Sequence, residues 1–181
     1  MRFPVPAVLA GGLAAVAALT VLDITTSQAR PLMDDAAILS AVEYAHIAEI
    51  ESGELAQSKA TSQEVKDMGR SFAEAHKQAQ TEVQELAKKL NFELKTADDD
   101  PAKKAHEETK DRLAELEGKA FDKAWVDNEV TFHQSTLEKI KAMIPTATNE
   151  DVKALLTATQ SSVEAHLEAA KGLQGKIVAA H

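Results

Sequence analysis

Apolar residues recur every three or four positions along four long segments of this chain, and this helical periodicity constrains its fold more than any other feature. The first predicted helix spans about Asp34–Ala60. A second begins just after a capping-box pattern at Thr61-x-x-Glu64 and ends near Asn91. Two more long helices are expected over about 119–144, before Pro145, and from Asn149 onward. The sequence therefore predicts an all-α protein.

The composition supports this interpretation and excludes several other classes of protein. Hydrophobic residues make up 44% of the chain, but aromatic residues only 4%, with 7 glycines and 5 prolines, which suits packed helices better than a β-fold. No cysteine is present, so disulfides, thiolate metal sites and cysteine nucleophiles are excluded. The net charge of −9 argues against nucleic acid as a partner.

A shorter helix is expected between the second and third long helices, over about Pro101–Glu117. Asp100 is a natural N-cap there, and proline is favoured at the first helical position. A connection of this length can carry the chain back along a bundle, as in ferritin-like four-helix bundles with one long crossover. An up-down-up-down bundle with a decorated loop is the alternative.

The N-terminal segment is predicted to be a secretory signal peptide. Arg2 precedes an apolar run from Val5 to Leu22, and Ser27-Gln28-Ala29 provides small residues at the positions that signal peptidase prefers. We therefore expect residues 1–29 to be removed and residues 30–181 to form one domain, periplasmic or secreted, with no membrane span after cleavage. An uncleaved membrane anchor is the alternative.

Each long helix carries one polar, metal-competent residue on its apolar stripe and close to its midpoint. Seven-residue spacing from apolar positions places these side chains on the buried face, and central positions share one level whichever way each helix runs. The four residues predicted to converge inside the bundle are Glu49, His76, His133 and His166. Glu129, four residues before His133, and His46, three before Glu49, are possible accessory groups.

Two interpretations of this cluster remain open at this point. Imidazole and carboxylate ligands suit Zn, Fe, Mn or Cu, so the four residues are candidate metal ligands. Glu129 would then be a fifth ligand or an acceptor for an imidazole N–H. Alternatively, buried His and Glu side chains form a hydrogen-bonded polar layer that fixes the register of the helices.

The patterns of several catalytic sites are missing. A carboxylate-bridged di-iron site needs Glu-x-x-His on two helices, but the residues three before the central histidines are Ala73, Val130 and Val163. The sequence also lacks a Gly-x-Ser-x-Gly elbow, a glycine-rich phosphate loop and a His-Glu-x-x-His motif. The sequence does not identify a cofactor, although a transition-metal ion is the candidate, and an enzymatic role is the less favoured hypothesis.

Several stretches resemble the bacterial domain of unknown function 4142 family. They are residues 48–56 followed by Val65-Lys66 and His76, residues 121–126 followed by His133-Gln134, and residues 165–170 around His166. The resemblance implies a ferritin-like fold, export to the bacterial envelope, often described as outer membrane, and no established activity. It carries over Glu49, His76, His133 and His166, although the family commonly has Asp where this chain has Ala75.

Two functions follow as hypotheses. The first is an exported envelope protein without catalytic activity, related to stress or metal tolerance and with a central Glu/His cluster. The second is a metal-binding protein or metalloenzyme that uses this cluster to hold an ion. The amount of metal in the purified protein distinguishes them.

Overall fold

The computed structural model describes residues 33–179, which form five helices. They are α1 (Asp35–Lys59), α2 (Gln63–Leu90), α3 (Pro101–Ala114), α4 (Gly118–Met143) and α5 (Glu150–Ala179). The predicted signal peptide, residues 1–29, lies outside the described residues. Between residues 33 and 179, no helix combines the length and apolar character that crossing a membrane requires.

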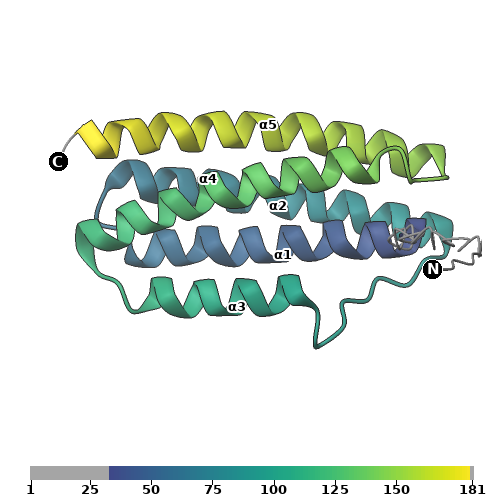
Figure 1. Ribbon diagram of the computed structural model, residues 1–181, viewed down its shortest axis with the longest axis horizontal. Helices are drawn as coiled ribbons and strands as arrows, with labels where there is room; N and C mark the ends of the chain where they lie inside the picture. The colour runs from purple at the N-terminus through teal and green to yellow at the C-terminus, as the bar shows by residue number, and fades with distance from the viewer. Residues whose placement is uncertain (1–32, 180–181) are drawn as a thin grey trace, which may run out of the picture. The chain divides into compact units, whose positions relative to one another are not determined.

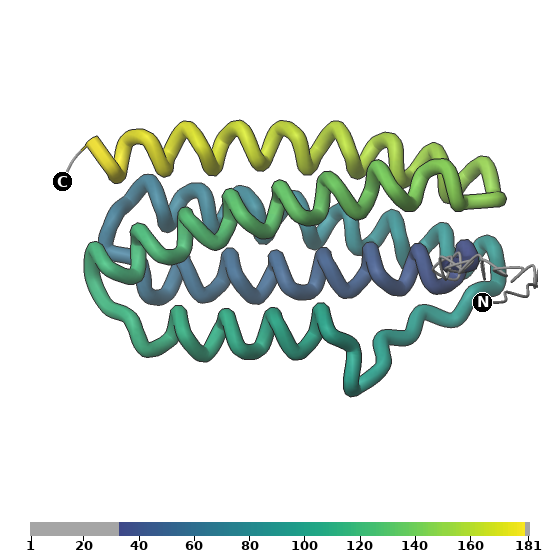
Figure 2. Tube along the Cα trace, viewed as in Figure 1, coloured from purple at the N-terminus to yellow at the C-terminus, as the bar shows by residue number. Residues whose placement is uncertain are grey.

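The long helices form two antiparallel pairs, α1 with α2 and α4 with α5 (Figure 1). Between the pairs, residues 91–117 return along the bundle and include α3, which packs beside α1 and α4. As a result α2 and α4 run in the same direction, as the trace in Figure 2 shows. This is the predicted all-α bundle with one long crossover, and the up-down-up-down alternative is wrong.

Helix starts follow the local signals in the sequence. Asp34 accepts a hydrogen bond from the Ala37 amide at 2.7 Å, and Asp100 accepts one from the Ala102 amide at 2.7 Å. The Asn149 side chain accepts one from the Asp151 amide at 2.9 Å. Each bond satisfies a helix-terminal N–H that has no partner within its helix.

The cap of α2 differs by one residue from the predicted capping box. Ser62 is the N-cap, and its hydroxyl accepts from the Val65 amide. The Thr61 hydroxyl instead donates to the buried carboxylate of Asp122 on α4, which also accepts from the amides of Thr61 and Ser62. Asp122 therefore ties the turn of the first pair to the second pair.

The core consists of two apolar clusters, one toward each end of the bundle. One surrounds the turn between α4 and α5 and includes Ile38, Val83 and Leu156. The other surrounds the turn between α1 and α2 and includes Val65, Phe121 and Trp125. The middle of the bundle, between these clusters, holds the polar residues described next.

Candidate metal centre

The four residues singled out by helical spacing come together in the middle of the bundle. Glu49 projects from α1, His76 from α2, His133 from α4 and His166 from α5. Glu49 and His133 are 2% and 0% exposed, His76 is buried and His166 is half-buried. Four helices thus each contribute one metal-competent side chain to a site that is largely closed to solvent.

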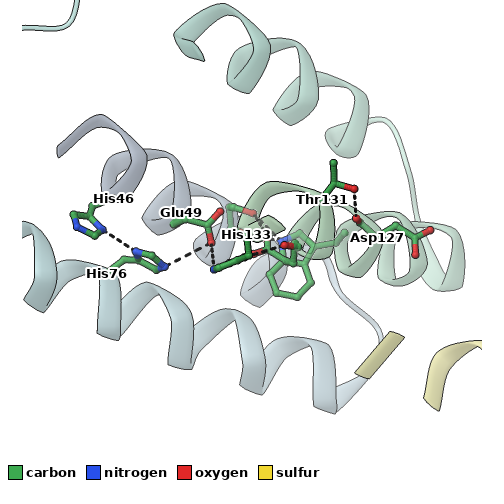
Figure 3. A network of polar contacts seen from close by, with 9 residues as sticks. His46, Glu49, His76, Asp127, Thr131 and His133 are labelled. Carbon is green, nitrogen blue, oxygen red and sulfur yellow. Dashed lines mark hydrogen bonds and ion pairs between the residues drawn. The ribbon is translucent and has the colours of Figure 1, made fainter. Parts of the chain in front are cut away.

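The spacing of the facing atoms is close to that of a metal coordination shell. The Glu49 Oε2 atom lies 3.6 Å from His133 Nε2 and 3.8 Å from His76 Nε2 (Figure 3). One ring nitrogen from each of His76, His133 and His166 lies within 4.8 Å of the other two. Ligands at 2.0–2.1 Å around a tetrahedral ion are about 3.3 Å apart, so the two Glu49 separations, 3.6 and 3.8 Å, are close to that spacing.

The proton on His133 is assigned by its hydrogen bond. Its Nδ1 atom lies 2.9 Å from the backbone carbonyl oxygen of Glu129, one turn earlier on α4. A carbonyl oxygen only accepts, so Nδ1 carries the proton and Nε2 carries the lone pair. That lone pair is on the nitrogen that faces Glu49, and a metal ligand needs it there.

His46 makes the corresponding contact to His76. The two Nδ1 atoms lie 2.9 Å apart, and Figure 3 draws this contact between the two rings. When His76 uses Nε2 as a ligand, its Nδ1 carries the proton and donates to His46. His46 thus lies behind His76, 4% exposed, and takes the place of a carboxylate partner.

Glu129 approaches the centre from the side of α4. Its Oε1 atom accepts a 2.7 Å hydrogen bond from the Ser52 hydroxyl, and the Trp125 indole N–H donates to the carbonyl and hydroxyl oxygens of Ser52. The Glu129 Oε2 atom lies 3.6 Å from His133 Nδ1. The carbonyl of Glu129, rather than its carboxylate, therefore makes the short contact to the imidazole.

Several buried polar atoms at this centre lack hydrogen-bond partners within residues 33–179. They include Glu49 Oε2, His76 Nε2, His133 Nε2 and His166 Nδ1, one from each helix. Buried polar groups in proteins are nearly always paired, so each exception needs an explanation. Three of these atoms, Glu49 Oε2, His76 Nε2 and His133 Nε2, are the ones that the short distances join.

Burial keeps the imidazoles neutral. It lowers the pKa of His76 to about 2, with the neighbouring histidines adding to the effect, and lowers the pKa of His46 to about 4. The pKa of His133 also falls to about 4 through burial, although its hydrogen bond to the Glu129 carbonyl opposes this. Burial lowers the pKa of His166 as well. Neutral imidazole is the form that binds metal ions.

Burial shifts the pKa values of the two carboxyl groups, Glu49 and Glu129, in the opposite direction, upward. Burial raises the pKa of Glu49 well above its usual value, and the adjacent Glu129 carboxylate raises it further. Burial also raises the pKa of Glu129, although its hydrogen bonds with Glu49 and then Ser52 work against this. Without a cation beside them, these groups favour the protonated form.

Phe72 and Ser52 also shape the centre, although neither was a predicted site residue. Phe72 stacks on the His166 ring with centroids 4.3 Å apart and lies 5.2 Å from the His133 ring. Ser52 reaches Glu129 from three residues after Glu49. Both lie on apolar stripes, so their spacing was visible in the sequence, but their contacts with other helices were not.

The family comparison agrees with this arrangement. Residues 23–173 match the domain of unknown function family DUF4142. The chain belongs to this family. The resemblance inferred from the sequence is therefore confirmed, and the match includes all of α1 to α4 and every residue of the centre. The comparison with curated proteins found no match.

Solved structures with the same fold are distant in sequence from this DUF4142 protein. A DUF305 protein from Streptomyces coelicolor, described as a putative secreted protein, is 12% identical, with a TM-score of 0.67, over 80% of this chain and 94% of that one. CopM in its Cu(II)-bound form is 15% identical, with a TM-score of 0.62, over 80% and 98%. CopM in its Ag-bound form is 16% identical, with a TM-score of 0.61, over 80% and 97%.

Proposed function

We propose that this chain is an exported protein that binds one divalent transition-metal ion inside its helical bundle, through Glu49, His76, His133 and His166. The observation that carries this proposal is a pair of candidate ligand groups that share His133, one made with His76 and His166 and the other with Glu49 and Glu129. Four of their buried atoms, one from each long helix, lack hydrogen-bond partners in the described part of the chain. A single ion between them would satisfy all four at once.

A hydrogen-bonded polar layer explains these atoms less well. In such a layer Glu49 hydrogen-bonds to its neighbour Glu129, and that contact is present. It leaves the imidazoles without partners, because the Nε2 atoms of His76 and His133 lie 3.8 and 3.6 Å from Glu49 Oε2, too far for a hydrogen bond. Each buried group left without a partner destabilises the fold by about 1–3 kcal/mol. Four such groups at one level are costly unless a ligand joins them.

The donor set indicates which ions to expect. Three imidazole nitrogens and one carboxylate oxygen suit Zn²⁺ and Cu²⁺, and the general order of affinity places Cu²⁺ highest among divalent first-row metals. The set contains no sulfur, so soft monovalent ions are disfavoured. Solved forms of CopM with Cu(II) and with silver support metal binding by a bundle of this kind, but the choice of ion rests on the residues here.

Export is the second part of the proposal. It is supported by the signal-peptide pattern ending at Ala29, and a structure of similar fold is described as a secreted protein. N-terminal sequencing of the protein from its native host tests it, with Arg30 expected as the first residue. Intact chains starting at Met1 in the membrane fraction would instead support an anchor.

Metal titration of the purified protein tests the centre. We expect one Zn²⁺ or Cu²⁺ per wild-type chain, and a melting temperature that rises with added metal because the ion binds the folded state. Glu49→Gln should weaken binding strongly and abolish that rise. His106→Ala, which removes a histidine on α3 outside the centre, is the matched control and should behave like wild type. Equal binding by all three proteins would contradict the proposal.

A further inference from the structure

One edge of the His166 ring faces solvent rather than the interior of the bundle. Glu49, His76 and His133 are buried, whereas His166 is half-buried. Its Nδ1 atom is buried, but its Nε2 atom is not among the buried unpaired atoms of residues 33–179. Nδ1 therefore faces the centre, and the edge of the ring that carries Nε2 faces outward.

Small side chains surround this outward edge. Phe72 of α2 stacks on the His166 ring, and Ala75 lies three positions further along the same stripe of α2. On α5, Ser162 lies four positions before His166 and Ala169 three positions after it, so both are its neighbours on the helix surface. Ala75, Ser162 and Ala169 are all exposed, and none is large enough to cover the ring edge.

The other sides of the centre are closed. Toward the two ends of the bundle, the apolar clusters fill the interior. A cavity of about 530 Å³ lies between α1, the crossover and α4, and His76 and His133 form part of its wall. The Nε2 atoms of these two residues are buried, and Glu49 is not part of that wall. The two rings therefore separate the cavity from the ligand atoms.

We infer that the metal ion enters and leaves the centre past His166, through the seam between α2 and α5 that is bordered by Ala75, Ser162 and Ala169. The inference rests on the proposed metal centre and concerns the route by which that centre exchanges its ion with solution. Opening this side displaces one side chain, His166, whose exposed neighbours are small. A path from the cavity would instead displace His76 or His133, which are packed inside the bundle.

Stopped-flow kinetics of Zn²⁺ uptake, and of Zn²⁺ release to a chromophoric chelator, test this route. Ala169→Phe places a large side chain over the outward edge of His166, because helical side chains lean toward the N-terminus of their helix. We expect uptake and release each to become about tenfold slower, with an unchanged dissociation constant, since obstruction of a route lowers both rates equally. Ala158→Phe, the same change at an exposed position of α5 about three turns away, is the matched control and should keep both wild-type rates.

A change in the cavity tests the opposite side. Ala45 lines the cavity, so Ala45→Leu narrows it without touching the seam. We expect both rates to stay at their wild-type values. Exchange that is slowed by Ala45→Leu but not by Ala169→Phe would overturn the route through the seam.

Chemical modification of the metal-free protein checks the orientation of His166 without any metal. Diethyl pyrocarbonate acylates accessible neutral imidazoles, and brief treatment followed by peptide mass spectrometry identifies the residues that react. We expect His166 to be modified, and His46, His76 and His133 to remain unmodified because they are buried. An unmodified His166, or equal modification of His76 and His133, would overturn the inference.

Zinc content and melting temperature are measured on every variant, so that the two proposals fail separately. Wild-type protein that takes up no zinc overturns the metal centre and this inference with it. If wild-type protein takes up zinc and folded Ala169→Phe exchanges it at the wild-type rates, the route alone is overturned. Equal slowing in Ala169→Phe and Ala158→Phe also overturns the route alone.

Discussion

The two helix pairs share a framework that their sequences barely reveal. Asp35 and Asp122, 87 positions apart, each hold the turn of the opposite pair. Asp122 accepts from Thr61 and Ser62, and Asp35 accepts in the same way from Thr148 and Asn149. The turn sequences 60–65, Ala-Thr-Ser-Gln-Glu-Val, and 147–152, Ala-Thr-Asn-Glu-Asp-Val, are also 87 positions apart. Residues of the two pairs that are separated by 87 positions are called corresponding residues below.

The pairs differ in how closely their helices pack. In the first pair, Gly53 and Gly69 bring the backbones of α1 and α2 together, and a Cβ on Gly69 would stand 2.8 Å from the Gly53 carbonyl oxygen. The corresponding residues of the second pair are Ile140 and Leu156, both buried in the apolar cluster near the α4–α5 turn. One pair is joined by close backbone contact and the other by large side chains.

The pairs also differ in chemistry. His46 and His133 are corresponding residues, but His133 faces Glu49 whereas His46 lies behind His76. His76 corresponds to Val163, and His166 to Ala79. The two pairs therefore have similar turns, but the residues proposed as ligands do not occupy corresponding positions in them. The centre is a single asymmetric site rather than a repeated one.

The largest expected effect is a difference in metal affinity between variants of His133 and of its corresponding residue, His46. His133→Ala removes a proposed ligand, so metal affinity should fall by more than 100-fold. His46→Ala removes only the partner of a ligand, which typically costs about 10–100-fold. Competition with a chelator of known affinity measures both constants. Equal losses would show that the two positions have equivalent roles.

The two pairs should be destabilised by opposite changes in side-chain volume, the second pair by a loss and the first pair by a gain. Ile140→Ala leaves a cavity and should destabilise by about 2–5 kcal/mol. Gly53→Ala adds a methyl group against the backbone of α2 and should destabilise by about 1–3 kcal/mol, despite the better helix propensity of alanine. Urea unfolding of the metal-free proteins measures both. A stabilised Gly53→Ala would refute the close contact.

The two linking aspartates should contribute about equally. Asp35→Ala and Asp122→Ala each remove the acceptor of three hydrogen bonds and leave backbone amides without partners, so each should destabilise by about 1.5–3 kcal/mol. They act at opposite ends of the bundle, so their effects should add in the double variant. Thermal unfolding of the four proteins tests this, and strong non-additivity would argue against two independent links.

The smallest expected effect concerns pH, and it arises where the pairs meet at Glu49 and Glu129. Burial and the neighbouring carboxylate raise the pKa of Glu49, so an ion must displace its proton, and affinity should rise about tenfold per pH unit while Glu49 is protonated. The pKa values of His76 and His133, about 2 and 4, leave these imidazoles neutral above pH 5. Calorimetry in buffers of different ionisation enthalpy should detect about one proton released per ion. Release of three protons would contradict the assignment.

Much of this structure could be predicted because its signals are local. Helix starts at Asp34, Asp100 and Asn149 depend on residues within three positions, and seven-residue spacing placed His133 and Glu49 on inward-facing stripes. Both residues lie near the middle of their helices, so they were expected at the same height in the bundle whichever way each helix runs.

The remaining features depend on contacts between distant residues. Thr61 looked like the cap of α2, but its hydroxyl bonds to Asp122, 61 positions away, and Ser62 caps the helix. His46 was predicted only as an accessory group, and its 2.9 Å contact with His76 joins two helices whose pairing the local sequence does not reveal. A comparison of residues 60–65 with 147–152 was the available signal for the shared framework, but which residues it links became visible only in three dimensions.

Anomalous diffraction from crystals of the Zn²⁺-loaded protein tests the central claim most directly. We expect one peak in the middle of the bundle, about 2.0–2.2 Å from His76 Nε2, His133 Nε2, His166 Nδ1 and a carboxylate oxygen of Glu49. Phe72 should remain stacked on His166 beside it. A fully loaded protein with no peak between these four residues, or with zinc bound only to surface groups, would contradict the metal centre.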